Sequence, residues 1–188
     1  MQNTLANIFR QSQTVFTISQ LSAILNEPDT SRIVKRMYYY VHNGQLLSLQ
    51  RGVYAKPGYN PEELACALYT PCYLSLEYVL QKAGVVFQYD SALTAVSYRN
   101  RTMEIDGHTI RYRQMRGEQI ADLRGIVNRG AVNIATPERA FLDVLYLNPQ
   151  YHFDNLHPLS RQEINRMLPL YRSKRMEERV KALFAAGK

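Results

Sequence analysis

Apolar positions in the first sixty residues predict two short helices joined by a turn. The first pattern runs from Ile18 to Leu25, and it ends before Pro28 because the residue that precedes a proline is disfavoured in a helix. The second pattern covers residues 30–42 and has its apolar positions at Ile33, Met37, Tyr40 and Val41. The Asn43-Gly44 pair that follows is typical of the end of a helix.

Polar residues at the starts of these helices support the prediction. Thr17 and Gln20 have the spacing of a capping box, in which each side chain accepts a hydrogen bond from the other residue's backbone N–H. Phe16 and Leu21 flank this box as an apolar pair, whose contact fixes the angle at which the chain enters the helix. The second helix is expected to be capped by Asp29 or Thr30, whose short side chains can accept from free N–H groups.

A hairpin is expected directly after the second helix. Leu46, Leu47 and Leu49 predict a strand, Arg51-Gly52 a tight reversal, and residues 53–55 the returning strand. Helix, turn, helix and hairpin in this order predict a winged helix-turn-helix, a module whose second helix enters the major groove of DNA. A further helix that begins near Leu5 would pack behind it.

The turn-rich stretch over residues 57–61 marks the expected boundary between domains of residues 1–59 and 60–188. Four strand regions are expected in the second domain, at residues 93–98, 101–115, 125–127 and 131–135, and the second of them turns back at Asp106-Gly107. Helices are expected after capping residues at Ser75, Thr136 and Ser160, and also over residues 62–69 and 173–186. The predicted fold class is α+β, a winged helix-turn-helix followed by a mixed α/β domain with a small, mainly antiparallel sheet and C-terminal helices.

Charge is distributed unevenly along the 188 residues. Residues 1–59 carry six Lys and Arg against two acidic residues, residues 60–150 nine against ten, and residues 151–188 eight against four. The net charge of +7 is therefore concentrated at the two ends of the chain. Such a balance fits a nucleic acid or an acidic protein as the partner.

The predicted second helix and hairpin carry the candidate DNA-binding residues. Arginine and lysine can bond guanine edges or phosphates, and hydroxyl groups suit phosphates. The candidates are Thr30, Ser31, Arg32, Lys35, Arg36 and Tyr39 on the helix, and Arg51 and Lys56 in and after the hairpin. A second basic face is expected on the last helix, at Lys174, Arg175, Arg179 and Lys181. It could meet DNA phosphate, RNA or an acidic partner.

The sequence offers little for metal or cofactor chemistry. The four histidines and the two cysteines, Cys66 and Cys72, match no zinc spacing, and no phosphate-binding glycine loop is present. Two cysteines are too few for a disulfide framework, so free thiols in a reducing cytoplasm are expected. No apolar run is long enough to span a bilayer. The expectation is therefore a cytoplasmic protein without a metal, a cofactor or a membrane partner.

A nuclease remains an alternative, because carboxylates can hold the metal ions that cleave phosphodiesters. It would require Glu104, Asp106, Glu138 or Asp143 to converge. Asp106 and Glu138 also have local explanations, in a turn and at a helix start, so the protein is expected not to be an enzyme. A protein-interaction module is a further alternative, since the run Tyr38-Tyr39-Tyr40 is the kind of aromatic cluster that interfaces use.

Three segments in order resemble the AbiEi family of antitoxins and transcriptional regulators of type IV toxin-antitoxin and abortive-infection systems. The first is the basic winged module that ends in LQRGVY at residues 49–54. The second is YLSLEYVL at residues 73–80, followed by Ala83-Gly84-Val85. The third is IATPERAFLD at residues 134–143. The resemblance extends from about residue 15 to residue 147, and the region beyond Leu147 matches less well.

The resemblance implies a protein of two functions. The N-terminal domain would bind inverted repeats in double-stranded operator DNA and repress its own operon. The C-terminal domain would counteract a nucleotidyltransferase-like toxin, with which it need not form a tight complex. A stand-alone regulator that keeps only the fold is the alternative, and the oligomeric state is left open.

Overall fold

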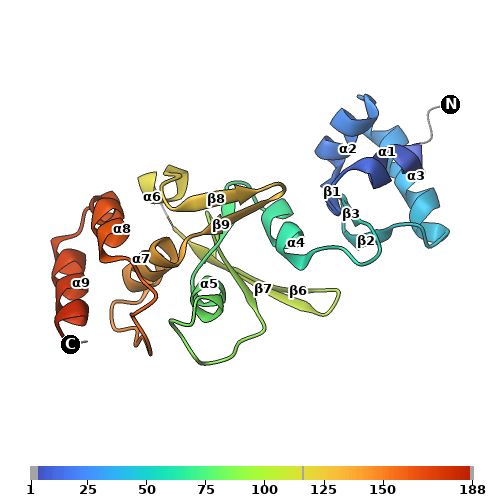
Figure 1. Cartoon of the computed structure of the whole chain (residues 1–188). Coiled ribbons are helices and arrows are strands. Elements are labelled where there is room, and N and C mark those ends of the chain that lie inside the picture. Colours follow the sequence, from blue (N-terminus) through green and yellow to red (C-terminus); the bar gives the residue numbers. More distant parts are fainter. Residues whose placement is uncertain (1–3, 116, 187–188) are drawn as a thin grey trace.

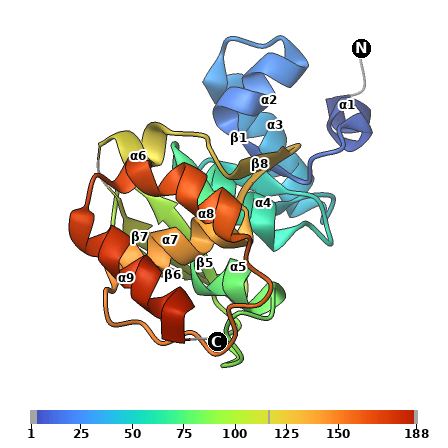
Figure 2. The same ribbon diagram turned by 60° about the vertical axis from the view of Figure 1, so that its left-hand side comes forward.

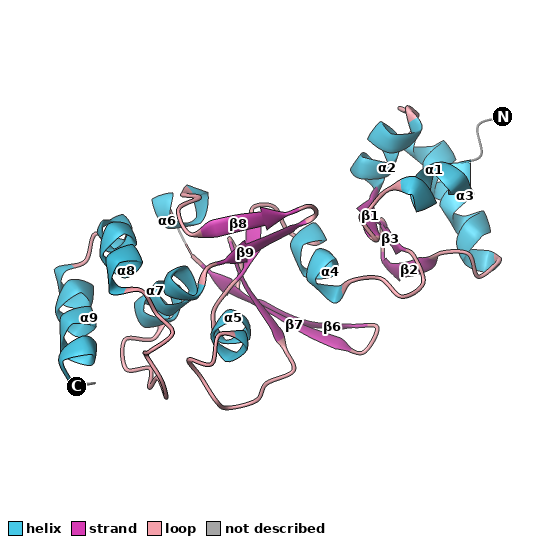
Figure 3. Cartoon of the chain, in the orientation of Figure 1, coloured by secondary structure: helices cyan, strands magenta, loops and turns pink. Residues whose placement is uncertain are grey.

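The computed structural model describes residues 4–115 and 117–186 and shows an α+β protein. A small N-terminal group of helices and strands lies beside a larger group that contains the main sheet, and the segment leading into α4 (Pro61–Ala67) joins them (Figures 1 and 3). The molecule is elongated, and the N-terminal elements and the C-terminal helices lie at its opposite ends (Figure 1).

The N-terminal group follows the expected order of elements, with one strand more than the sequence indicated. It comprises α1 (Thr4–Arg10), β1 (Val15–Thr17), α2 (Ile18–Leu25), α3 (Thr30–His42), β2 (Leu47–Gln50) and β3 (Val53–Ala55). The strands form an antiparallel sheet in the order β1-β3-β2. The additional strand, β1, is only three residues long and pairs with residues 53–55, far along the chain, so no local periodicity marks it.

Side chains from these elements close a small hydrophobic core. Buried residues of α1, α2, α3 and the sheet pack together: Ile8, Phe16, Leu21, Ile33, Met37, Leu46 and Tyr54. The expected caps are confirmed. Gln20 N–H donates to Thr17 Oγ1 and Thr17 N–H donates to Gln20 Oε1, at 3.4 and 2.8 Å. Asp29, rather than Thr30, caps α3 by accepting from the N–H groups of Ser31 and Arg32.

The larger group is built on a mixed sheet with the strand order β6-β7-β5-β4-β9-β8. Its strands are β4 (Cys72–Leu74), β5 (Leu93–Ser97), β6 (Arg101–Ile105), β7 (His108–Gln114), β8 (Ile126–Arg129) and β9 (Val132–Ala135). Neighbours β5 and β7, and β4 and β9, run parallel, whereas the other three pairs are antiparallel. The sheet therefore contains three antiparallel and two parallel pairs, whereas a mainly antiparallel sheet was expected. The hairpin at Asp106-Gly107 is confirmed, and both residues have the positive φ that such a turn requires.

Helices cover the two faces of this sheet. Successive residues of a strand point to opposite faces, so Cys72 and Leu74 face α4 while Tyr73 faces α7 (Pro137–Leu147). Tyr112 OH donates to Ala65 O at 2.8 Å and fixes α4 on its face. The other helical elements are α5 (Glu77–Lys82), α6 (Glu118–Ala121), α8 (Arg161–Met167), the 3-10 helix η1 (Leu168–Tyr171) and α9 (Lys174–Ala186).

Two of the expected caps in this part of the chain were wrong or incomplete. Ser75 does not cap α5. It is fully buried, and its hydroxyl donates to Asp143 Oδ2 at 2.8 Å. Ser160 does cap α8, by accepting from Glu163 N–H. Ser160 and Glu163 also have the spacing of a capping box. The N–H of Ser160, however, donates to Glu138 of α7 rather than to the Glu163 side chain. In both cases a partner distant in sequence replaces the local one.

Hydrogen bonds hold the two groups together at the joint before α4. Glu63, nearly buried on α4, accepts from the N–H and hydroxyl of Thr14 and from the N–H of Val15. Nearby, Tyr59 OH donates to Asp106 Oδ2 at 3.0 Å. Burial and this hydrogen bond raise the pKa of Tyr59 to about 12. The joint is therefore a bonded contact rather than a free linker.

Candidate nucleic-acid interface

Helix α3 is amphipathic, with a buried side and a basic exposed side. Ile33 and Met37 are 0% exposed, whereas the side chains of Arg32 and Arg36 are 68% and 44% exposed. Thr30, Ser31, Lys35 and Tyr39 are also exposed. Residues three and four apart share one side of a helix, so this set forms a continuous surface. All the candidate residues that the sequence placed on this helix are therefore accessible to a polyanion.

Two carboxylates hold the arginines of this surface. Glu27 Oε2 lies 3.8 Å from Arg32 Nη1 and 3.7 Å from Arg36 Nη2, and Asp29 Oδ2 lies 3.3 Å from Arg32 Nε. The arginine side of each of these ion pairs is exposed to solvent, and such pairs contribute little to stability, about 0–1 kcal/mol. Phosphate or base contacts can therefore replace them at small cost.

The turn between α2 and α3 fixes the position of these carboxylates. Asn26 ends α2 in the left-handed conformation. Ser22 Oγ donates to Glu27 O at 2.7 Å, and Asp29 N–H donates to Glu27 Oε1 at 3.1 Å. Glu27 is consequently only 13% exposed, and it presents its second oxygen toward the arginines.

Replacing Asp29 with alanine is expected to destabilise the protein by about 1 kcal/mol, because the first N–H groups of α3 lose their acceptor. Chemical denaturation of the wild type and the variant would measure this change. Asp29→Asn is the matched control, since asparagine can still cap the helix but cannot pair with Arg32. An Asp29→Asn variant as unstable as Asp29→Ala would assign the effect to the ion pair instead.

Tyr38 and His42 extend the exposed side of α3 beyond the predicted set. Tyr38 is 71% exposed and stacks on His42, with ring centroids 6.2 Å apart and planes within 11°. Tyr39, which is 62% exposed, packs edge-on against Tyr40. The spacing of four residues between Tyr38 and His42 would have indicated the stack, although neither residue was predicted to contact DNA.

The β2–β3 hairpin carries the second part of the interface. Arg51 is exposed at its turn, next to Gly52, whose φ of +79° favours glycine. Gly52 O accepts a hydrogen bond from Ile18 N–H at 3.1 Å, and the Ile18 side chain would lie 3.3 Å from a β-carbon at Gly52. The hairpin is thus anchored to the start of α2, and its basic tip has a fixed place relative to the helices.

Lys56 lies apart from this tip, at the other end of β3. Its Nζ donates to the carbonyl oxygens of Phe9 and Gln11 and lies 5.6 Å from the centroid of the Phe16 ring. Partial burial lowers the pKa of the Lys56 ammonium group, although Glu63 opposes the shift. The structure therefore directs this side chain to the segment after α1, and does not bring it together with Arg51.

Helix α9, which carries the second basic face, lies at the opposite end of the molecule from α3 in Figure 1 and well apart from it in Figure 2. Lys174, Arg175 and Lys181 are exposed on α9, and Arg179 is half-buried. Met176 and Val180, on the opposite side of this helix, are buried, at 2% and 4% exposure. The two basic surfaces do not form one site.

The carboxylates considered for a nuclease do not converge. Asp106 bonds Tyr59, Glu138 accepts from Ser160 N–H, and Asp143 is fully buried on α7. Within residues 4–115 and 117–186, no group of three or more His, Cys, Asp and Glu side chains is arranged to hold a metal ion.

Asp143 belongs to a buried ion pair that the sequence did not reveal. Its Oδ1 accepts from Arg139 Nε at 3.2 Å, and both side chains are 0% exposed. Hydroxyl groups of Ser75, Tyr73 and Tyr171 also donate to Asp143. Burial acts to lower the pKa of Arg139, but Asp143 and the two tyrosines outweigh it and hold the pKa above its usual value.

The same arginine fastens the segment that leads into β8. Its guanidinium donates to the carbonyl oxygens of Gln119, Asp122 and Arg124. No buried side-chain polar atom in the described part of the chain lacks a hydrogen-bond partner. The cluster therefore has a structural arrangement, with its charges fully occupied and out of reach of a substrate.

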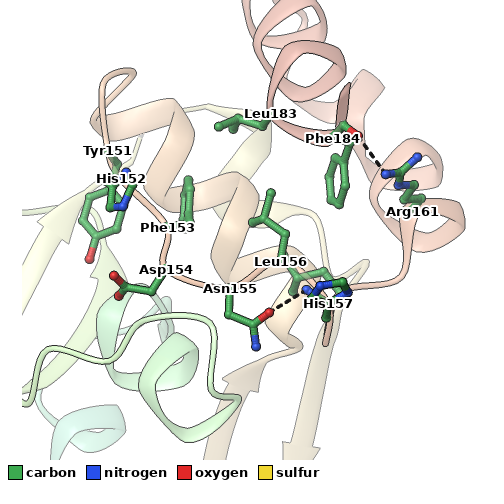
Figure 4. A pocket seen from close by; sticks show the side chains of 11 residues that line it. Tyr151, His152, Phe153, Asp154, Asn155, Leu156, His157, Arg161, Leu183 and Phe184 are labelled. Carbon is green, nitrogen blue, oxygen red and sulfur yellow. Dashed lines mark hydrogen bonds between the residues drawn. The ribbon is translucent and has the colours of Figure 1, made fainter. Parts of the chain in front are cut away.

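A groove of about 500 Å³ opens between the loop after α7 and the last turns of α9 (Figure 4). The two charged side chains of the groove are hydrogen-bonded to backbone groups of the chain. Asp154 accepts from Phe87 N–H, and Arg161 donates to Phe184 O at 2.8 Å. The remaining lining is largely aromatic and aliphatic, with two histidines, from Tyr151, His152, Phe153, Asn155, Leu156, His157, Leu159, Leu183 and Phe184. The groove presents no converging set of reactive groups.

No protein-family model matches the chain, and a search of curated proteins finds no match. Among the helices that the structure describes, none is both long and apolar enough to cross a membrane.

Proposed function

We propose that residues 1–59 are a winged helix-turn-helix that binds double-stranded DNA. In this proposal α3 lies in the major groove and the β2–β3 hairpin lies against the sugar-phosphate backbone. The observation that carries the proposal is the exposed basic side of α3, with Arg32, Lys35 and Arg36 accessible and Ile33 and Met37 buried behind them.

The side chains divide by chemistry into two roles. Arg32 and Arg36 have planar guanidinium groups that can bond guanine O6 and N7 together, so they are proposed to read bases. Lys35 and the hydroxyl groups of Thr30, Ser31 and Tyr39 suit phosphate oxygens, which position the helix. Arg51 is proposed to meet a phosphate from the hairpin. Lys56 would contribute only to the local positive potential, because its ammonium group is bonded within the chain.

We further propose that the whole chain is an AbiEi-like autorepressor and antitoxin, a binding protein rather than an enzyme. Support comes from the order of the three sequence segments that resemble this family, two of which meet in the structure where Tyr73 and Ser75 bond Asp143. The partners would be inverted repeats in its own operator and a nucleotidyltransferase-like toxin. The proposed toxin would be encoded beside this protein and would arrest the growth of cells that express it alone. Co-expression of this protein should then restore their growth. Continued arrest would leave a stand-alone regulator.

Fluorescence anisotropy tests the DNA-binding proposal directly. A labelled duplex from the region upstream of the gene is titrated with the full chain at several salt concentrations, beside a scrambled duplex of equal length. Specific binding that weakens as salt rises is expected, because bound cationic side chains release counterions from DNA. The absence of salt-dependent binding to any duplex would refute the proposal.

Replacing Arg51 with alanine is expected to weaken binding to specific and scrambled DNA alike. The slope of log affinity against log salt should fall by about one ion, because one phosphate contact is lost. The anisotropy titrations described above would measure the slope. Arg101→Ala, an exposed arginine of the C-terminal sheet, is the control and should leave it unchanged. A sequence-selective loss at Arg51 would instead indicate contact with a base.

A protein-interaction module is the second candidate function. The exposure of Tyr38 and Tyr39, at 71% and 62%, favours it, because large aromatic side chains supply much of the affinity of protein interfaces. Tyr38→Ala separates the two functions. It should reduce capture of a protein partner if α3 is a protein interface, whereas loss of DNA affinity would assign the stacked Tyr38 and His42 rings to the nucleic-acid surface.

A further inference from the structure

The two cysteines of the chain lie where α4 packs on β4. Cys66 is at the C-terminal end of this helix, and Cys72 is the first residue of β4, on the face that α4 covers. They are the only cysteines in the sequence. A local reversal of the chain between helix and strand thus brings together two thiols that are six positions apart.

The contacts of the two sulfur atoms define the geometry of the pair. The two side chains are close enough for each thiol to shift the pKa of the other. Cys66 Sγ also lies 3.6 Å from Asn133 O, and Cys72 Sγ lies 3.5 Å from Ala65 O, in the residue next to Cys66. Both thiols are free, and they differ in access, since Cys66 is partly exposed and Cys72 is only 7% exposed.

The environment also makes the two thiols chemically unequal. The neighbouring Cys72 side chain lowers the pKa of the Cys66 thiol, and backbone groups of Asn133 and Leu74 act in the same direction, whereas burial opposes the shift. The neighbouring Cys66 side chain and burial raise the pKa of the Cys72 thiol. Since the thiolate is the nucleophile, the more accessible sulfur is also the more reactive one.

We propose that Cys66 and Cys72 are a redox modification site, at which a hydroperoxide such as hydrogen peroxide produces a reversible intramolecular disulfide. Cys66 is the attacking thiol and Cys72 the resolving thiol. The proposal is independent of DNA binding, because it depends only on the contact, the unequal access and the absence of any other cysteine in the sequence.

The chemistry proceeds in two balanced steps. The Cys66 thiolate attacks one oxygen of the peroxide, so that an S–O bond forms and the O–O bond breaks. The hydroxide that leaves takes up the proton that the Cys66 thiol released on ionisation and becomes water. The Cys72 sulfur then attacks the Cys66 sulfenic acid, so that the S–S bond forms and the S–O bond breaks. The departing hydroxide takes the Cys72 proton and becomes water. Two thiols are oxidised by two electrons in total, and one peroxide is reduced to two molecules of water.

The disulfide would tie α4 to β4 at a place that matters for the joint between the two parts of the molecule. The other end of α4 carries Glu63, which accepts hydrogen bonds from Thr14 and Val15. Amide hydrogen exchange of α4 is therefore expected to slow on oxidation, because local opening of the helix would be restrained at its C-terminal end.

Mass spectrometry of the full-length protein tests the proposal. The reduced protein is treated with hydrogen peroxide at neutral pH, unfolded, and alkylated with N-ethylmaleimide. The expected product is about 2 Da lighter, the mass of two hydrogens, and takes no maleimide, whereas reduction with dithiothreitol restores two adducts. Peptide mapping should place the bond between Cys66 and Cys72. Circular dichroism before alkylation should match that of the reduced protein.

Single cysteine variants check the assigned roles, with dimedone present to trap sulfenic acid. Cys72→Ser should accumulate a dimedone adduct at Cys66, because the resolving thiol is missing. Cys66→Ser should react with hydrogen peroxide more slowly than the wild type or Cys72→Ser, since its remaining thiol, Cys72, is buried. Disulfide formation only between molecules, or equal reaction rates for the two variants, would overturn the proposal. So would an intramolecular disulfide that forms only after unfolding.

Discussion

Replacing Asp143 with alanine is expected to lower the free energy of unfolding by about 3–5 kcal/mol, because removing one partner leaves a buried charge unpaired. Arg139 is 0% exposed, and Asp143 is the acidic side chain that neutralises it. The hydroxyl groups of Ser75 and Tyr171 would also lose their acceptor in the sealed interior. Urea denaturation followed by circular dichroism would measure the change as a lower midpoint.

Two comparisons identify the cause of this loss. Glu104→Ala removes an exposed carboxylate from β6 and should change stability by less than about 0.5 kcal/mol. Combining Asp143→Leu with Arg139→Met should cost less than the sum of the two single changes, because neither charge is then left alone. A wild-type denaturation midpoint in Asp143→Ala would show that the ion pair does not hold this part of the fold.

Much of the fold could be predicted because its signals are local. The box formed by Thr17 and Gln20, the turn at Asp106-Gly107 and the start of α7 at Thr136 each involve residues within a few positions of one another. In each case the hydrogen bond or the backbone conformation depends only on residues that are close in sequence, so one short stretch carries the necessary information.

The errors occur where partners distant in sequence decide the structure. Strand β4 is three residues long, and it exists because β5 and β9 pair with it on either side. Ser75 has the sequence context of a helix cap, yet the carboxylate of Asp143, 68 positions away, takes its hydroxyl. A buried hydroxyl gains more from a charged acceptor than from a helix end that other groups can cap.

The buried ion pair left only a weak signal in the sequence. Arg139 and Asp143 have the spacing of four residues that brings side chains together on a helix, and they border the apolar positions of α7. The same spacing is common on exposed helices, however. The pair becomes part of a buried cluster because Tyr73 of β4 and Tyr171 of η1 bond Asp143, and neither tyrosine is near α7 in the sequence.

The candidate interface was predictable in its helix but not in its details. The period of α3 places Lys35 opposite Ile33 and Met37, and that periodicity can be read without a structure. The direction of Lys56 toward Phe9 and Gln11 cannot, because it depends on how α1 lies beside β3. A lysine in an apparent hairpin therefore carried less information than one on a strongly periodic helix.

Replacing Arg36 with alanine is expected to weaken binding to the specific duplex by about 1–3 kcal/mol, or roughly 5-fold to 150-fold, if the proposed function is correct. The Arg36 side chain is 44% exposed, and among the described residues its guanidinium group forms one ion pair, 3.7 Å from Glu27, so it is free to bond a guanine edge. Binding to the scrambled duplex should fall much less, since a base contact contributes only at its own sequence. Anisotropy titrations of both duplexes at one salt concentration would give the ratio.

The expected pattern distinguishes base recognition from simple charge. Arg166→Ala is the matched control, because Arg166 is also an exposed helical arginine paired with a carboxylate, at 2.9 Å from Glu163, but lies on α8. It should leave both affinities unchanged. Arg36→Lys keeps the charge and loses the planar fork, so it should lose specific binding while it retains binding to the scrambled duplex. Equal losses on the two duplexes for Arg36→Ala would move Arg36 from the bases to the phosphates, and no loss on either would remove it from the interface.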